Sequence, residues 1–181
     1  MKNQKGFSLI ELLIVVVIIG IIAAIAIPNL LAARRSANEG SAVSSLRTVH
    51  GAQATFQATS GNGNYAGGGT GADDIAGLTE LNTTGLIDAV LASGSKSGYA
   101  FLMRNYDFVT TGTPNPATFA IVTKPTGNAG LTATGTRNFA IATDGVLAAE
   151  VLPSTGGAGS MVLGGSATAG ASYSNGTAMG N

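Results

Sequence analysis

The chain has no cysteine and no tryptophan, and only 10% of its 181 residues are charged. Without cysteine it forms neither disulfide bonds nor thiolate metal and redox sites. Nine basic residues balance nine acidic ones, and a nucleic-acid binding surface needs clustered Lys and Arg to neutralise phosphates. We therefore expect no direct contact with nucleic acid, no cofactor and no metal site.

The sequence also offers little for catalysis. His50 is the only histidine, and no serine has the glycine frame of a hydrolase nucleophile. The stretch 94–97 lacks the glycine that precedes lysine in a phosphate loop. Asp73 and Asp74 have no further acidic neighbours, so we interpret them as a solvated helix cap and not as a cation site. We predict no catalytic residue and no enzymatic activity.

What the chain does have is a long apolar run near its amino terminus. The sixteen residues from Leu12 to Ile27 carry no charge and no hydrogen-bonding side chain. Lys2 and Lys5 precede the run, which is the pattern of a segment whose amino terminus stays in the cytoplasm. Glu11 adjoins the run, and a carboxylate within a membrane costs about 2.5 to 3.5 kcal/mol on insertion scales. Glu11 therefore requires a partner.

The residues at the start of this run carry a motif. Gly6-Phe7-Ser8-Leu9-Ile10-Glu11-Leu12-Leu13 resembles the amino terminus of type IV prepilins and of their relatives, the type II secretion pseudopilins. The resemblance implies that residues 1–6 are a leader, that a membrane-embedded prepilin peptidase cuts after Gly6, and that the new amino terminus at Phe7 is methylated. The alternative is an ordinary secretory signal cut near residues 24–26, which would discard the apolar run.

The resemblance also implies a partner for Glu11. In the family, this carboxylate pairs with the positively charged amino terminus of a neighbouring subunit, here that of Phe7. Such a pairing makes insertion of a subunit favourable mainly at a growing filament end, because an unpaired charge is costly in lipid. The alternative is that Glu11 only lies near a helix amino terminus, where the helix dipole favours an anion.

We predict one helix from Phe7 to about Ala58, roughly 52 residues and about 78 Å at 1.5 Å per residue. Residues 7–33 would form the membrane-spanning and filament-core half, and residues 34–58 the amphipathic half. Arg34 and Arg35 mark where the helix leaves the membrane on its outer side.

Two residues in the apolar half predict a local weakness. Pro28 lacks the backbone N–H that an α-helix needs, so we expect a kink there. By resemblance to the family, we also expect the span from about Gly20 to Pro28 to loosen when subunits pack into a filament.

The amphipathic half predicts contact with a globular head. Ala42, Leu46, Val49 and Phe56 recur at spacings of four, three and seven, which places them on one helix face. Gln53 interrupts this stripe.

The head begins with residues 59–98, which we interpret as a glycine-rich loop followed by short helices, with Asp74 as an N-cap. Residues 99–152 predict an antiparallel sheet of roughly four strands, because apolar and polar residues alternate and Asp144-Gly145 predicts a tight turn. The strands centre on Tyr99–Met103, Phe119–Ile121, Phe139–Ile141 and Val146–Val151. The predicted fold class is α+β and pilin-like, a long helix packed on an antiparallel sheet.

Residues 153–181 contain no charged residue and are rich in Gly, Ser, Ala and Thr, which is typical of a mobile tail. The alternative is that this segment forms an outer filament surface open to glycosylation.

The sequence thus predicts a structural subunit, the major pilin of a type IV pilus filament. Its partners would be copies of itself in a helical homopolymer, a prepilin peptidase, an inner-membrane assembly platform with its ATPase, and membrane lipid before assembly. It would reside in the inner membrane before assembly and in an extracellular filament afterwards. One alternative is the major pseudopilin of a type II secretion system, and a second is a non-polymerising membrane-anchored binding protein. Pseudopilins of that kind have an acidic calcium site near the carboxyl terminus, where this chain has only Asp144 and Glu150 before a neutral tail.

Overall fold

The computed structural model divides the chain into two units, Met1–Arg34 and Arg35–Asn181. We call the second unit the head. The structure describes residues 6–68, 74–107, 116–152, 162–166, 170–174 and 176–179.

Helix α1 extends from Leu9 to Thr59, so the predicted helix is confirmed to within two residues at either end. Pro28 lies inside it, and the helical assignment continues through Gly20 and Pro28. The helix ends where predicted, because Asn62 and Gly63 take the left-handed backbone that stops a helix (φ 49° and 90°).

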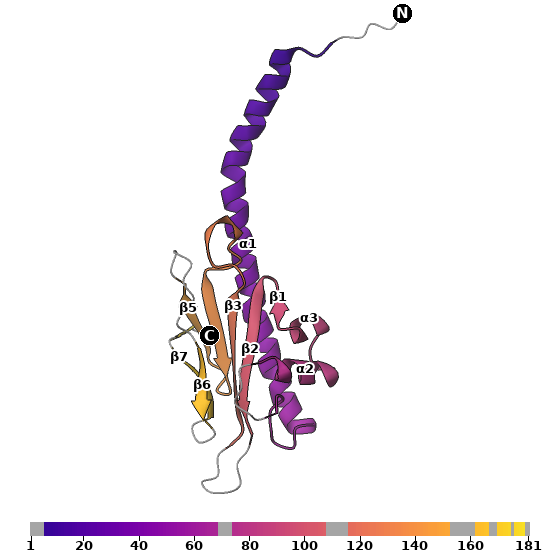
Figure 1. Ribbon diagram of the computed structural model, residues 1–181, viewed down its shortest axis with the longest axis vertical. Coiled ribbons are helices and arrows are strands. Elements are labelled where there is room, and N and C mark those ends of the chain that lie inside the picture. The colour runs from indigo at the N-terminus through magenta and orange to yellow at the C-terminus, as the bar shows by residue number, and fades with distance from the viewer. Residues whose placement is uncertain are drawn as a thin grey trace, which may run out of the picture. The chain divides into compact units, whose positions relative to one another are not determined.

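A six-stranded antiparallel sheet forms the centre of the head, in the order β1-β2-β3-β4-β5-β8 (Figure 1). Its strands are β1 (Ser95–Lys96), β2 (Tyr99–Tyr106), β3 (Thr118–Pro125), β4 (Arg137–Ala142), β5 (Leu147–Val151) and β8 (Thr177–Ala178). Strands β2 to β5 are the four that the sequence predicts, and they form a simple meander. The two additional strands are two-residue edges that no periodicity could reveal.

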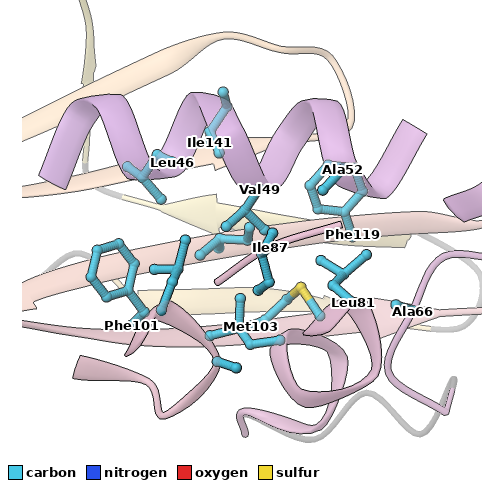
Figure 2. Packing of buried hydrophobic residues seen from close by; sticks show 14 of the residues in the cluster. Leu46, Val49, Ala52, Ala66, Leu81, Ile87, Phe101, Met103, Phe119 and Ile141 are labelled. Carbon is cyan, nitrogen blue, oxygen red and sulfur yellow. The ribbon is translucent and has the colours of Figure 1, made fainter. Parts of the chain in front are cut away.

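The main core lies between the sheet and the helix. Strand β2 alternates buried and less buried residues, so that Tyr99, Phe101 and Met103 share one buried face. Leu46 and Val49 of α1 are 0% exposed and belong to the same core (Figure 2). The predicted packing of the helix stripe on an antiparallel sheet is therefore confirmed.

The opposite face of the sheet is lined with small residues and carries a second layer. Its buried cluster consists of Ala120, Val122, Ala140, Ala142 and Ala148. Strands β6 (Val162–Ser166) and β7 (Gly170–Ser174) pair with each other and lie against β2 and β3.

These strands correct the prediction of a tail without regular structure, because β6, β7 and β8 all fall within residues 153–181. Composition alone misses them, since Gly and Ala have low strand propensity and form strands here through their pairing and packing. The rest of that predicted tail, residues 153–161, 167–169, 175 and 180–181, lies outside the described residues.

Two short helices connect α1 to the sheet, α2 (Ala76–Thr83) and α3 (Ala89–Ala92). The predicted N-cap at Asp74 is wrong by one residue: Ile75 occupies that position without a side-chain cap, and the Asp74 carboxylate accepts a hydrogen bond from the Ala76 N–H at 2.9 Å. Asp88 caps α3 by accepting from the Leu91 N–H at 2.6 Å. Asp73 lies outside the described residues.

Candidate assembly segment

The first turn of α1 is capped by a side-chain hydrogen bond. Ser8 immediately precedes the helix, and its backbone N–H donates a hydrogen bond to Oε2 of Glu11 at 3.0 Å. Serine followed three residues later by glutamate is the capping-box pattern. The pattern is visible in the sequence, although the predicted role of Glu11 included only its charge pairing and the helix dipole. Glu11 therefore has a local structural role besides the predicted pairing.

The capping bond does not neutralise the carboxylate. Of the residues that the structure describes, none forms an ion pair with Glu11. Its side chain is exposed, and a carboxylate has two oxygens that together accept several hydrogen bonds. Glu11 thus retains the capacity to bind a cation from outside its own chain.

The apolar segment from Phe7 to Leu30 exposes its large side chains on every side. Phe7 is 80% exposed, and Leu9 79%. The helix has a stretch long and apolar enough to cross a membrane, and none of that stretch is buried within the chain. A helix that is apolar all round is stable only in a membrane or among partner helices.

The structure places the other predicted site residues along this segment without bringing them together. Gly6 and Phe7 are exposed and precede the helix. A side chain at Gly20 would meet no atom within 4 Å, and Pro28 lies about two turns farther along. Among these predicted residues, only Glu11 forms a side-chain contact in the described part of the chain, and that contact is with Ser8.

At the start of the head, α1 is fastened to the loop between β3 and β4. Arg35 donates from Nη2 to the Gly130 carbonyl at 2.9 Å and from Nε to the Ala133 carbonyl at 3.3 Å. Asn38 donates to the Thr134 carbonyl at 2.9 Å. The sequence predicted Arg35 only as a marker of the membrane boundary. Its carbonyl partners lie 95 and 98 residues away, so no local pattern identifies them.

One turn farther along, a partly buried ion pair joins the helix to β4. Glu39 is 6% exposed and lies 2.7 Å from Nη2 of Arg137. The Thr136 N–H and hydroxyl each donate to the same carboxylate at 2.8 Å. Burial by itself raises the pKa of Glu39, but the bonds from Thr136 and Arg137 outweigh it, so the pKa lies below its ordinary value.

Gln53, which appeared to interrupt the apolar stripe, is fully buried within it. Its amide accepts a hydrogen bond from the Ala66 N–H at 2.9 Å and donates to the Ala66 carbonyl at 3.2 Å. The same amide donates to the sulfur of Met103 at 3.0 Å. Gln53 thus supplies the partners that the backbone at Ala66 needs in order to be buried.

His50 is half-buried and its ring packs against Phe119, with centroids 5.6 Å apart. Within the described ranges, no group of three or more His, Cys, Asp or Glu residues gathers as a metal site would require. The chemically distinctive surface in the described structure is therefore the exposed apolar helix with its single carboxylate.

Comparison with known proteins agrees with that surface. A family model described as the prokaryotic N-terminal methylation motif matches residues 1–27. The type IV wide pilus major component PilA4 of Thermus thermophilus is 69% identical over 39 residues, which are 22% of this chain and 30% of that protein. The type II secretion system core protein G of Klebsiella pneumoniae is 38% identical over 52 residues, 29% of this chain and 37% of that protein. No solved structure matches the chain significantly.

A fimbrial protein of Pseudomonas aeruginosa extends the likeness into the head. It is 38% identical over 115 residues, which cover 55% of this chain and 75% of that protein. These relatives are structural subunits, and none is described as an enzyme. The chain therefore belongs to the family of type IV pilins and type II secretion pseudopilins.

Proposed function

We propose that this chain is the major pilin of a type IV pilus, a subunit that polymerises through its amino-terminal helix. The observation that carries the proposal is the exposed apolar segment from Phe7 to Leu30, which has no partner surface within the described chain. Lateral packing of such helices in a filament core would bury this surface. Before assembly, insertion into the membrane would cover the same surface with lipid.

Processing would remove residues 1–6 and leave a methylated amino group on Phe7. The match of residues 1–27 to the methylation motif supports this step. Cleavage between Gly6 and Phe7 would leave the Ser8 N–H intact, so the capping bond to Glu11 is compatible with it. A prepilin peptidase would perform the cleavage, and an inner-membrane platform with a cytoplasmic ATPase would drive assembly.

Glu11 would then have two duties. Its bond to Ser8 closes the first helical turn, and its charge would attract the amino group of Phe7 on the next subunit. In the low dielectric of a filament core, an unpaired carboxylate is far costlier than a paired one. Pairing would therefore set the register between neighbouring subunits.

The pilus interpretation is favoured over the pseudopilus by the extent of likeness. The fimbrial relative aligns over 115 residues, whereas the core protein G relative aligns over 52. The latter match still makes the major pseudopilin of a type II secretion system the second candidate. In either case the subunit would begin in the inner membrane, and in the first it would end in an extracellular filament.

The test uses Glu11→Gln, because glutamine can still accept the Ser8 N–H bond but has no charge. We expect wild-type filaments sheared from cells to contain protein beginning at methylated Phe7 by mass spectrometry. The Glu11→Gln protein should be cleaved and membrane-bound yet absent from sheared material.

Normal filaments from Glu11→Gln would show that capping, and not charge, is the role of this residue. Wild-type protein that is processed but never sheared would favour the pseudopilus or the non-polymerising anchor. An amino terminus near residue 27 would contradict the proposal, because the assembly segment would have been discarded.

A further inference from the structure

Two large apolar side chains are conspicuously exposed on the described part of the head. Val151 is 75% exposed and Leu131 is 74% exposed, whereas the next most exposed, Val90, is at 58%. Single exposed apolar residues are common on protein surfaces. These two are of interest because both lie at the end of the head where α1 enters it.

Leu131 is presented by a fixed turn. It is the central residue of the 3-10 helix η1 (Gly130–Thr132), and carbonyls on both sides of it accept hydrogen bonds from Arg35. The loop is closed below the turn by a bond from the Thr134 N–H to the Gly127 carbonyl at 2.7 Å. A side chain at Gly135 would collide with the Tyr99 ring, so the loop is held closely against the sheet.

Val151 lies at the same end of the head. It ends β5 directly opposite Arg137, whose guanidinium binds Glu39 of α1. The next residue, Leu152, donates its N–H to the Thr136 carbonyl at 2.8 Å, which ties the end of β5 to the same loop. Leu131 and Val151 are thus both adjacent to residues bonded to the first turn of α1 in the head. We call these two residues the basal patch.

Chain connectivity keeps this end of the head within a short distance of the end of the apolar run. Arg35 follows Leu31 by four residues, a distance of about 6 Å in a helix and at most about 14 Å in an extended chain. The headgroup layer on each side of a bilayer is about 5 to 8 Å thick. A loop bonded to Arg35 therefore stays within reach of the headgroups when the apolar run spans the bilayer.

The chemistry around the basal patch suits an anionic lipid surface. Residues 126–136 contain no charged side chain, so contact through Leu131 requires no ion to be desolvated. Beside Val151, the Glu150 carboxylate accepts a hydrogen bond from the Asn138 side chain at 3.1 Å. Arg34 is exposed and Arg35 binds neutral carbonyls beside Leu131, whereas the charge of Arg137, opposite Val151, is paired with Glu39. The carboxylate of Glu39 is already occupied by Thr136 and Arg137. Basic residues beside a membrane attract anionic headgroups.

We propose that Leu131 and Val151 insert into the headgroup region of an anionic bilayer and orient the head before the subunit is incorporated into a filament. This inference rests on the proposed membrane insertion of α1. The partner is the lipid surface itself, and contact with a second copy of the chain is the competing outcome.

The absence of tryptophan from the chain makes a direct test possible. Leu131→Trp, Val146→Trp and Ile22→Trp each introduce a single fluorophore into the full-length protein, reconstituted at low density in vesicles that contain anionic and bromine-labelled lipids. Val146 is the matched control: it is an exposed apolar residue next to Gly145, which lies by His50, fifteen residues beyond Arg35 along α1. Circular dichroism confirms that each variant is folded.

We expect emission from Ile22→Trp and Leu131→Trp to be shifted to the blue and quenched by brominated lipid, and emission from Val146→Trp to be unaffected. Equal emission from the 131 and 146 variants, with Ile22→Trp quenched, would overturn the basal contact and leave membrane insertion standing. An unquenched Ile22→Trp would overturn the insertion on which both proposals rest. A blue shift of Leu131→Trp that grows with protein density without quenching would assign the patch to a second copy and overturn the lipid contact.

Discussion

Both parts of α1 carry large apolar side chains but place them in opposite surroundings. Leu30, in the amino-terminal unit, is 69% exposed, whereas Leu46, sixteen residues later, is 0% exposed. The second part has a sheet of its own chain to pack against, and the first has none in the described structure. The apolar surface of the first part is therefore available for lipid or for other subunits.

The sharpest test of this comparison removes one large side chain from each part. Leu46→Ala should lower the free energy of unfolding of the head by about 2 to 5 kcal/mol, since it leaves a cavity in a packed core. Ile19→Ala, at a position 60% exposed, should leave that free energy unchanged. Denaturant unfolding in detergent, followed by near-ultraviolet circular dichroism of the buried tyrosine, measures both.

If Ile19→Ala destabilised the head as much as Leu46→Ala, the two parts would form one cooperative unit. The loss of filament yield in the two variants should rank in the opposite order to their effects on unfolding. We expect Ile19→Ala to reduce assembly through lost packing between subunits, while properly folded Leu46→Ala protein keeps an intact assembly surface.

The carboxylates of the two parts also differ. Glu39 is satisfied within the head, whereas Glu11 has only the Ser8 N–H. Because bonds from Thr136 and Arg137 lower the pKa of Glu39 below its ordinary value despite its burial, the folded head binds this proton less readily than the unfolded chain. The stabilisation from Glu39 is therefore fully present above about pH 4.5 and lost as the pH falls through the folded-state pKa.

We expect Glu39→Gln to lower the free energy of unfolding at pH 7 by about 1.5 to 3 kcal/mol, toward the lower end because Arg137 is partly exposed and solvent weakens the pair. The difference from wild type should shrink at pH 3. Urea unfolding at both pH values measures it, with Asp107→Asn as the control, since Asp107 follows the end of β2 remote from Arg137. A pH-independent difference would show that Glu39 acts through shape and not through charge.

Sequence periodicity predicted the elements with a strong pattern and failed where stability comes from distant partners. The helix and strands β2 to β5 follow from apolar alternation and from turn residues such as Asp144-Gly145. Strands β6 and β7 consist largely of small residues, pair with each other and lie against β2 and β3, which adjoin them only in the folded chain. No local pattern encodes that contact.

The candidate site shows the same division. The prepilin-like motif and Glu11 were recognised because their residues are adjacent in sequence, and the Ser8 to Glu11 cap was equally legible. Glu39 and Gln53 were not recognised, because a polar residue on an apolar helix face reads as an interruption. Their partners, at Thr136 and Ala66, are separated from them by 97 and 13 residues. Buried polar residues on a helix are thus best identified after the opposing loop is known.

Two glycines on α1 give the finest comparison of its two parts. Gly20 and Gly40 both face open space, so a methyl group would meet no atom at either position. Gly40→Ala should raise the free energy of unfolding of the head by up to about 1 kcal/mol, because alanine favours the helix and restricts the unfolded chain. Gly20→Ala should leave that value unchanged, since it lies outside the head.

Assembly should respond in the opposite way. If the span from Gly20 to Pro28 loosens on incorporation into a filament, as we propose, the Gly20→Ala substitution strengthens the helix that must open. It should then slow filament growth in cells relative to Gly40→Ala, while subunit levels in the membrane stay equal. Equal growth rates would show that the helix enters the filament without opening at Gly20. Any loosening of the helix would then be confined to the neighbourhood of Pro28.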